Sequence, residues 1–394
     1  MTPAARVQAA IEILDLVVDA ARSKGAPADR IVSDWFKTRR FAGSKDRRAV
    51  RELVFAAIRA CGPVPPDGRA AMQRLAQDDP GIVPLFDGSR HGPPPIIEGE
   101  AIAEGGFAPG WLEDQLAASG IVGDELSALL ERAPLDIRPN TLRGDAAQIA
   151  ASLPEAGERT AAPLALRYPP GTRIEQWDAF ANGAIEVQDS GSQLACAAVD
   201  AQAGETVIDL CAGAGGKTLA LAAAMANSGT LLACDIDRSR LSRLGPRAGR
   251  AGASVIETRL LDPGKEPAML ADFAGRADAV LVDAPCSGTG TWRRNPEARW
   301  RLDPKALARF SAAQDALLAL GVSLVKPGGR LVYVTCSMLD AEGPDRIDAF
   351  LASNPGWSVQ MTDIGAGRNR GNGMRLTPFH DGTDGFFVAR LTSA

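Results

Sequence analysis

The stretch TVIDLCAGAGGKT, residues 206–218, determines how the sequence is interpreted, because an apolar run there ends in a glycine-rich loop that opens a helix. Glycines let a backbone turn tightly and approach a ligand, and the first turn of a helix offers free N–H groups. Two phosphate-binding loops do not match. A P-loop needs glycine where Cys211 stands, and a dinucleotide-binding loop needs glycine at Thr218. The loop therefore predicts a nucleoside ligand that has no pyrophosphate.

Strands and helices alternate around this loop, from about residue 183 onward. The expected strands are 206–210, 230–234, 254–258, 279–282 and 330–335, and the expected helices are 216–226, 238–250 and 304–325. Near-continuous apolar strands separated by helices are typical of a parallel sheet covered on both faces. The end differs, because 374–377 and 386–391 are short β segments with no helix expected between them. That pattern favours an antiparallel hairpin at one edge of the sheet.

A carboxylate follows each of three consecutive expected strands, at Asp235, Asp262 and Asp283. Ligands of open α/β sheets lie at the carboxyl ends of the strands, and a carboxylate about 20 residues after the glycine loop accepts hydrogen bonds from ribose hydroxyls. Asp235 fits that position, and Asp262 is placed for the adenine edge. One strand-end aspartate alone is more often a helix cap. Three in series favour the loop of a class I S-adenosylmethionine (SAM) methyltransferase.

Three regions are expected before the alternating part. Residues 1–62 should form an all-α module, because apolar residues recur there at helical spacing. Residues 63–133 combine many prolines and glycines with two expected short helices, so we interpret them as a linker. Residues 134–182 should form a small α+β domain, and residues 183–394 the catalytic domain.

The chain has 394 residues, of which 45% are hydrophobic and 23% are charged. This composition excludes a disordered, collagen-like or coiled-coil chain, and the length allows a full core without disulfides or metals. No apolar run approaches the ~20 residues of a membrane-spanning helix. The amphipathic N-terminus does not resemble a secretory signal. We therefore expect a cytoplasmic protein with neither a membrane nor a metal partner.

The net charge is −5, but positive charge is concentrated locally. Residues 37–51 hold Lys37, Arg39, Arg40, Lys45, Arg47, Arg48 and Arg51 against Asp46 alone. A second basic run holds Arg293, Arg294, Arg299, Arg301 and Lys305 against Glu297 and Asp303. Local basic patches form phosphate-binding surfaces. Solvated helix faces explain each run equally well.

The six cysteines and two histidines limit the chemistry further. No two cysteines form a CxxC pair, which excludes zinc ribbons and thioredoxin-like sites, and two histidines are too few for a His-rich metal site. A single cysteine is usually a small buried hydrophobic residue, as we expect of Cys61, Cys196 and Cys234. Cys286 and Cys336 differ, because each follows a strand of the expected sheet. If those strands are neighbours, both thiols face one cleft beside the cofactor.

Two thiols beside a methyl donor indicate methylation at a carbon that is not itself nucleophilic. Carbon 5 of a pyrimidine becomes nucleophilic once a thiolate adds to carbon 6, which is covalent catalysis. Only the thiolate attacks, so nearby charge such as Lys217 or the sulfonium has to lower the thiol pKa. Asp283 is placed to hydrogen-bond the ring nitrogen or the exocyclic amine. After methyl transfer, the carbon 5 proton leaves and the thiol is expelled.

These motifs resemble those of the RsmB-type (Nol/Nop/Sun) RNA cytosine-5 methyltransferases. The resemblance rests on VQDSGSQ (187–193), DLCAGAGGKT (209–218), DAPCSGTG (283–290), TCS (335–337) and DGFF (384–387). It covers residues 134–394 and extends more loosely to the N-terminal helices, which resemble a NusB-like RNA-binding module. The resemblance implies a Rossmann-like class I methyltransferase domain that uses SAM, preceded by a small RNA-binding domain.

The resemblance also implies roles for single residues. Cys336 is the expected nucleophile, and Cys286 is the second cysteine, which assists release of the methylated RNA. Contacts with SAM are expected from Cys211, Ala212, Gly213, Ala214, Gly215, Gly216, Lys217, Asp235, Asp262 and Asp283. Ala214 departs from the family, whose loop usually has proline there. Ribosomal RNA is the favoured substrate.

Other functions remain open at this point. Transfer RNA is an alternative substrate to ribosomal RNA. An enzyme that methylates an exocyclic amine would need an aromatic residue in the motif after the fourth strand, and DAPC has none. A non-catalytic RNA-binding or ribosome-assembly factor would not need Cys286, Cys336 and the glycine loop, so their presence argues against it.

Overall fold

The computed structural model describes residues 1–39, 42–360 and 363–393, and the chain divides into two compact units. Unit 1 consists of Met1–Glu131 together with Thr291–Asp303, and unit 2 consists of Arg132–Gly290 and Pro304–Ala394. Arg40, a member of the first basic run, lies outside the described residues. Among the helices described, none combines the length and the hydropathy needed to cross a membrane.

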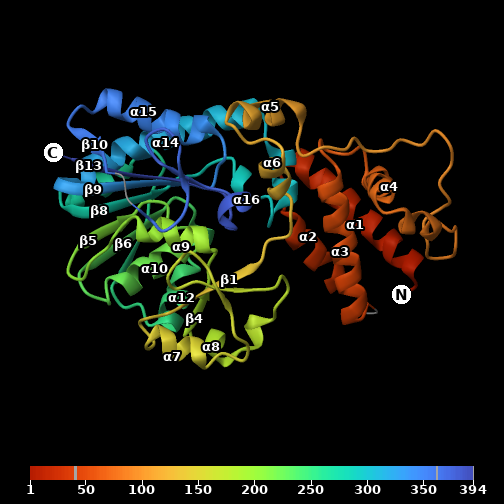
Figure 1. The fold of residues 1–394 in the computed structure, drawn as a ribbon, viewed down its shortest axis with the longest axis horizontal. Helices are drawn as coiled ribbons and strands as arrows, with labels where there is room; N and C mark the ends of the chain where they lie inside the picture. Colours follow the sequence, from red (N-terminus) through yellow and green to blue (C-terminus); the bar gives the residue numbers. More distant parts are fainter. Residues whose placement is uncertain (40–41, 361–362, 394) are drawn as a thin grey trace. The chain divides into compact units, whose positions relative to one another are not determined.

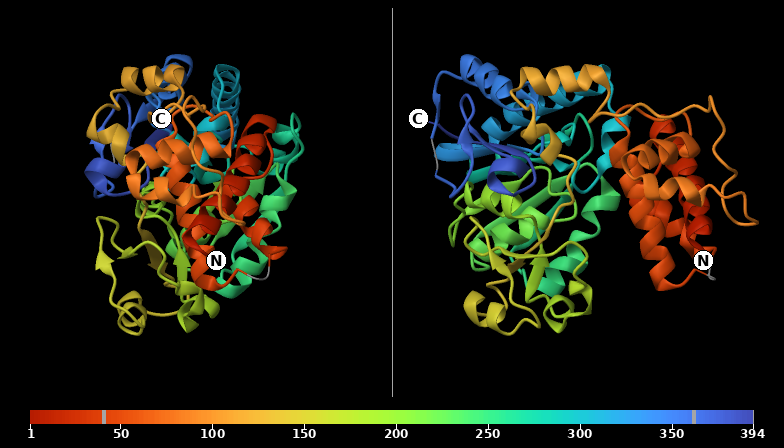
Figure 2. Two further views of the ribbon diagram at one scale, coloured as in Figure 1. Left: turned by 90° about the vertical axis from the view of Figure 1, so that its right-hand side faces the viewer. Right: turned by 45° about the vertical axis from the view of Figure 1, so that its right-hand side comes forward.

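Unit 1 is helical, and its helices α1, α3 and α4 pack side by side (Figures 1 and 2). Its helices are α1 (Pro3–Ser23), α2 (Ala28–Lys37), α3 (Ser44–Ala60), α4 (Gly68–Asp78), α5 (Gly110–Ala118) and α6 (Asp124–Ala128), with the 3-10 helices η1 (Pro80–Leu85) and η5 (Pro296–Arg301). Val7, Leu14, Val54 and Ile58 are fully buried between these helices. The helical spacing of apolar residues therefore corresponds to the core of unit 1.

Helix α4 lies inside the segment expected to be a linker, so the helical core continues past residue 62. Ala70, Met72 and Leu75 of this helix are buried in that core. The side chain of Asp67 caps the helix by accepting a hydrogen bond from the backbone N–H of Ala70 at 2.7 Å. Prolines on both sides of the segment interrupt the periodic pattern, which is why the sequence does not reveal this helix.

Neither interpretation of the second basic run, a phosphate-binding surface or a solvated helix face, fits its arginines Arg299 and Arg301. Arg299 is 0% exposed within unit 1, and its Nη2 donates to the backbone oxygens of Ile58 (2.7 Å) and Cys61 (2.6 Å). Arg301 donates from Nη1 to the backbone oxygen of Gly25 at 2.8 Å. These carbonyls lie at or just beyond helix ends, where intrahelical partners run out. The arginines therefore join η5 to α1 and α3.

We expect Arg299→Ala to lower the free energy of unfolding of unit 1 by about 2–4 kcal/mol, because buried carbonyls lose a charged donor. The matched control is Arg48→Ala, which removes an exposed arginine of unit 1. Urea denaturation followed by circular dichroism measures both. Equal stability of the two variants would contradict a structural role for Arg299.

Unit 2 begins with a small antiparallel sheet in the order β2-β3-β1-β4. Its elements are β1 (Leu135–Pro139), α7 (Ala146–Ala151), β2 (Glu158–Arg159), β3 (Leu166–Tyr168), η2 (Ile174–Gln176), α8 (Asp178–Ala181) and β4 (Ile185–Val187). The sheet thus extends beyond the expected boundary at residue 182, because β4 pairs with β1.

The main sheet of unit 2 has the order β11-β12-β13-β9-β8-β5-β6-β7, and β10 pairs with β13. Its strands are β5 (Thr206–Asp209), β6 (Thr230–Asp235), β7 (Ile256–Leu260), β8 (Ala277–Asp283), β9 (Val325–Thr335), β10 (Trp357–Val359), β11 (Arg368–Asn369), β12 (Met374–Leu376) and β13 (Phe386–Ser393). Strands β5 to β9 pair in parallel, and the pairs that involve β10 to β13 are antiparallel. The expected parallel sheet with an antiparallel terminal hairpin is confirmed.

Helices cover both faces of this sheet (Figure 1). The helices that follow β4 along the chain, apart from η5, are α9 (Ser190–Ala197), α10 (Gly216–Ala224), α11 (Arg238–Leu241), α12 (Leu244–Ala251), α13 (Glu266–Met269), α14 (Pro304–Leu324), α15 (Pro344–Ser353) and α16 (Pro378–Asp381), with η3 (Ala271–Phe273), η4 (Thr289–Thr291) and η6 (Asp340–Glu342). Val207 of β5 packs on the α9 and α10 side, and its neighbour Ile208 packs on the α14 and α15 side. Both faces are therefore apolar, as the continuous hydrophobic strands predict.

Two helix expectations in unit 2 are wrong in detail. The helix expected over 238–250 is divided into α11 and α12, because Pro246 has no N–H to donate to the carbonyl of Ser242. The one-turn helix α16 lies between β12 and β13, where no helix is expected. It begins at Pro378, and the Thr377 side chain caps it by accepting from the N–H of His380.

Candidate active site

The residues expected to bind a cofactor gather at the carboxyl ends of parallel strands. Asp235 and Asp283 are the last residues of β6 and β8, and Asp262 follows β7 by two positions. Asp209, for which no role is expected, ends β5. The strand order changes direction between β5 and β8, because β6 lies on one side of β5 and β8 on the other. Ligands of open α/β sheets bind at such a switch point.

The glycine loop turns between β5 and α10 in a conformation that side chains would obstruct. Gly213 and Gly215 have φ of 55° and 88°, in the left-handed region that favours glycine. A Cβ on Gly215 would lie 2.1 Å from Leu244 Cδ1, whereas a Cβ on Gly216 would meet no atom within 4 Å. Space therefore remains at the start of α10. Burial raises the pKa of the neighbouring Cys211 thiol, which favours its neutral form.

Asp235 is held against the glycine loop by backbone hydrogen bonds. Its Oδ2 accepts from the N–H of Gly213 and its Oδ1 from the N–H of Asp237, both at 2.7 Å. Each oxygen keeps a further lone pair for a ligand hydroxyl. Asp262 is exposed, with its Oδ2 3.7 Å from Lys265 Nζ. A fixed acid beside an open helix N-terminus fits the ribose of an adenosyl cofactor.

The side chains of Cys286 and Cys336, which follow β8 and β9, are in contact. These strands are parallel neighbours, and the Sγ atoms of Cys286 and Cys336 lie 3.4 Å apart. Both thiols are free and half-buried. The hydrogen bond with Cys336, together with burial, raises the pKa of Cys286 well above the usual thiol value. Cys286 is therefore held as a thiol beside its neighbour.

An ion pair lies beside the cysteines. Lys217 Nζ is 2.7 Å from Asp283 Oδ2 and 5.5 Å from the centre of the Phe386 ring. Burial alone would lower the pKa of Lys217, but the charges of Asp283 and nearby thiols raise it above the usual lysine value. The ammonium group therefore stays charged beside the cysteines.

The remaining motifs of the resemblance converge on the same edge. The N–H of Gly385 donates to the backbone oxygen of Gly290 at 2.8 Å, and the N–H of Gly290 donates to the backbone oxygen of Cys336 at 2.9 Å. The N–H of Asp384 donates to Asp189 Oδ2 at 3.2 Å. The structure thus brings the DGFF, VQDSGSQ and cysteine segments together.

Two side chains at this edge make contacts that could not be predicted from the sequence. Arg247 donates from Nη1 to the backbone oxygen of Ala214 at 2.7 Å and from Nη2 to Glu186 Oε2 at 2.8 Å, which ties the glycine loop to β4. Glu342 is buried beneath both cysteine segments. Neither stands in a motif, and the charged neighbours Asp340 and Asp345 of Glu342, and Arg243 and Arg250 of Arg247, leave no local sequence signal that singles them out.

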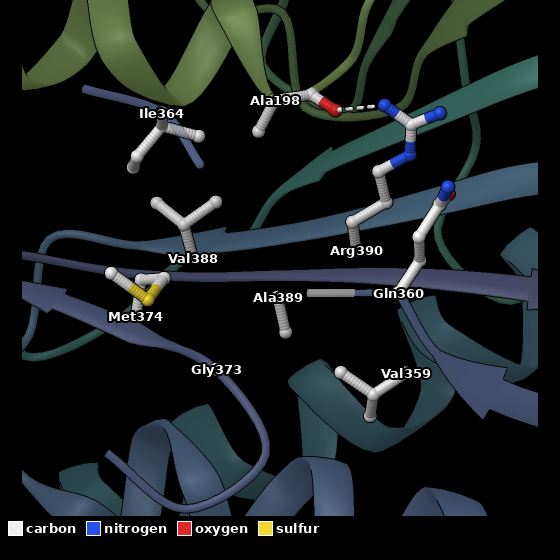
Figure 3. A pocket seen from close by; sticks show the side chains of 9 residues that line it. All are labelled: Ala198, Val359, Gln360, Ile364, Gly373, Met374, Val388, Ala389 and Arg390. Atoms are coloured by element: carbon white, nitrogen blue, oxygen red, sulfur yellow. Dashed lines mark hydrogen bonds between the residues drawn. The ribbon is translucent and has the colours of Figure 1, made fainter. Parts of the chain in front are cut away.

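The small pocket of Figure 3 is a different place in unit 2. It is lined by Ala198, Val359, Gln360, Ile364, Gly373, Met374, Val388, Ala389 and Arg390, none of which belongs to the predicted site. Across the described part of the chain, no group of three or more His, Cys, Asp or Glu side chains is placed to hold a metal ion.

A parallel sheet with this switch point, a glycine loop and strand-end acids defines a class I methyltransferase domain. The chain belongs to the family of 16S rRNA methyltransferases RsmB/F, whose model matches residues 196–392. A solved structure described as PH0851 matches 99% of this chain and 99% of its own, with a TM-score of 0.78 and 26% identity. NSun6 from Pyrococcus horikoshii, solved with SFG, shares the fold over 71% of this chain and 97% of its own at a TM-score of 0.62 and 18% identity.

Two curated relatives show how much of a longer protein is matched. The probable ribosomal RNA small subunit methyltransferase B of Synechocystis sp. is 36% identical over 287 residues, which is 69% of this chain and 63% of that protein. The Bacillus subtilis protein of the same description is 32% identical over 265 residues, 65% of this chain and 59% of that protein. The match therefore spans less than two thirds of the length of either relative.

Proposed function

We propose that this protein transfers a methyl group from SAM to carbon 5 of a cytosine in RNA, with ribosomal RNA as the substrate. The single observation that carries the proposal is the 3.4 Å separation of the Cys286 and Cys336 sulfurs at the ends of adjacent parallel strands. The family assignment supports RNA methylation, and the two thiols support attack on a pyrimidine carbon.

The residues at the site divide the work of this reaction. SAM, when bound, supplies a methyl group on a positively charged sulfur. The Cys336 thiolate adds to carbon 6 of the cytosine, and the electron pair of the carbon 5–carbon 6 double bond becomes available at carbon 5, which takes the methyl group. Asp283 accepts a hydrogen bond from the exocyclic amine, and Lys217 holds Asp283 in place.

Cys286 acts in the second half of the reaction. Once carbon 5 carries both a methyl group and a proton, the proton has to leave to a base. The electron pair of that carbon–hydrogen bond then restores the double bond and expels the Cys336 sulfur as a thiolate. Cys286 assists this release, a role supported by its half-buried thiol 3.4 Å from that sulfur.

RNA is the proposed partner, and the first basic run supplies exposed charge for it. Lys37 pairs with Asp34 at 2.6 Å and Arg48 with Glu52 at 3.1 Å, both on the surface of unit 1. Exposed ion pairs contribute only about 0–1 kcal/mol each, so a phosphate can replace the carboxylate at low cost. We also propose that unit 1 is a NusB-like RNA-binding module.

Labelled SAM distinguishes the candidate substrates and products. The protein is incubated with methyl-labelled SAM and either 16S rRNA, small ribosomal subunits or transfer RNA, and the RNA is digested to nucleosides. We expect label in 5-methylcytidine from the ribosomal substrates. Label in an amine-methylated nucleoside would contradict the carbon chemistry, and label in transfer RNA alone would change the substrate. A protein that binds RNA without transferring label would be a non-catalytic factor.

Asp235→Ala should weaken SAM binding by about 1.5–3 kcal/mol, roughly 10- to 100-fold, because a charged acceptor for ribose hydroxyls is lost. Asp237→Ala is the matched control, since that exposed acid caps α11 through Ser239 and Arg240. Isothermal titration calorimetry measures both. Unchanged SAM affinity in Asp235→Ala would remove the proposed ribose contact.

A further inference from the structure

Glu342 occupies an unusual position for a carboxylate. It ends the short helix η6, is 0% exposed, and lies beneath the two loops that carry the cysteines. A buried carboxylate is costly unless hydrogen bonds replace its water. Its partners therefore indicate what it is placed there to hold.

Four neutral donors meet the Glu342 carboxylate. Oε1 accepts from the N–H of Ser287 at 2.9 Å and from Gln314 Nε2 at 3.2 Å. Oε2 accepts from Ser337 Oγ at 2.6 Å and from the Ser287 hydroxyl. The same residue also contacts strand β9, because its backbone oxygen accepts from Tyr333 OH at 2.9 Å.

Ser287 and Ser337 are the residues that directly follow Cys286 and Cys336. One carboxylate therefore holds both cysteine segments at the point where the β8 and β9 ladder has ended. The two serine hydroxyls are also 3.2 Å from each other, and Thr289 Oγ1 accepts from the N–H of Met338 at 2.8 Å. These contacts add a hydrogen-bonded network between two loops that also meet through the backbone hydrogen bond from Gly290 to Cys336.

We propose that Glu342 is a positioning residue that sets the separation of the Cys286 and Cys336 sulfurs. It touches neither sulfur and acts through the two serines. The negative charge of Glu342 is one of the causes that raise the pKa of Cys286, which agrees with a role in keeping that cysteine a thiol. The catalytic consequence rests on the proposed function, but the separation of the sulfurs does not.

A dithiol reagent measures the separation directly. Phenylarsine oxide reacts with two neighbouring thiols to form two arsenic–sulfur bonds and one water, made from the oxide oxygen and the two thiol protons. We expect tight binding to the unmodified protein and weak binding to Cys286→Ser, which sets the baseline. Glu342→Ala should weaken binding at least about tenfold, the worth of one or two hydrogen bonds.

Glu342→Gln provides the conservative variant. Its amide oxygen still accepts from Ser287 and Gln314, and its amide nitrogen donates to the serine hydroxyls, which can reorient. We expect it to bind the arsenical within about threefold of the unmodified protein. Asp278→Ala is the structural control, because Asp278 accepts from the N–H of Thr206 at 2.8 Å at the opposite end of β8. It should lower stability and leave arsenical binding unchanged.

Methylation provides the second readout. Glu342→Ala should lower kcat at least about tenfold with KM for RNA and SAM affinity nearly unchanged, and Glu342→Gln should restore most of kcat. If Glu342→Ala does not fold, Ser337→Ala replaces it, since that variant removes one donor on the Cys336 side only. A folded Glu342→Ala or Ser337→Ala with full arsenical affinity would overturn the proposal. If the Glu342 variants change arsenical binding as expected but the unmodified protein does not methylate RNA, the proposed function is wrong and the positioning role of Glu342 stands.

Discussion

Cys336→Ala should abolish both methylation and covalent attachment to RNA. Without the thiolate, carbon 5 of the cytosine is never activated, so we expect the rate to fall by at least about a thousandfold. Label transfer from SAM and a denaturing gel for the protein–RNA adduct measure the two losses. SAM affinity should stay unchanged, because Cys336 lies outside the glycine loop.

Cys61→Ala is the matched control for this result. Cys61 is buried in unit 1, and burial raises its pKa to about 12, so it is an unreactive thiol. The control should methylate normally. Normal methylation by Cys336→Ala would show that the covalent mechanism is wrong and would favour an amine-directed reaction.

Cys286→Ala should produce the opposite phenotype, a protein that accumulates in covalent complex with its RNA. Attack by Cys336 and methyl transfer remain available, but expulsion of the Cys336 sulfur loses the thiol that lies 3.4 Å away. Turnover should fall to a small fraction, while a slow band of protein joined to RNA appears on a denaturing gel.

The double variant connects the two results. Cys286→Ala combined with Cys336→Ala should show no adduct, because nothing is trapped without attack. A trapped species that appears with Cys336→Ala and disappears with Cys286→Ala would reverse the roles of the cysteines.

The parallel sheet and its functional edge can be predicted from the sequence because one physical rule governs both. Strands buried on two faces are continuously apolar, and the carboxyl ends of parallel strands share an edge. Asp235 and Asp283 end such strands, and Cys286 and Cys336 follow them, so their proximity follows from the order of elements. The neighbour relation of β8 and β9, on which the cysteine pair depends, is confirmed.

The sequence could not reveal contacts that depend on packing between distant segments. In the sequence, Arg299 cannot be distinguished from an exposed arginine. Its structural role depends on its hydrogen bonds with the helix-end carbonyls of Ile58 and Cys61. The positioning role proposed for Glu342 likewise depends on its hydrogen bonds with Ser287 and Ser337, which are 55 and 5 positions away in the sequence. Composition and periodicity describe local structure, and neither contains these pairings.

The most direct test of the account identifies the atom that holds the RNA. The Cys286→Ala protein is incubated with SAM and its RNA substrate, the trapped complex is digested with nuclease and trypsin, and the peptides are analysed by mass spectrometry. We predict a methylated cytosine nucleotide on the peptide that contains Cys336. A nucleotide attached to any other residue, or a trapped nucleotide without a methyl group in the presence of SAM, would contradict the proposed mechanism.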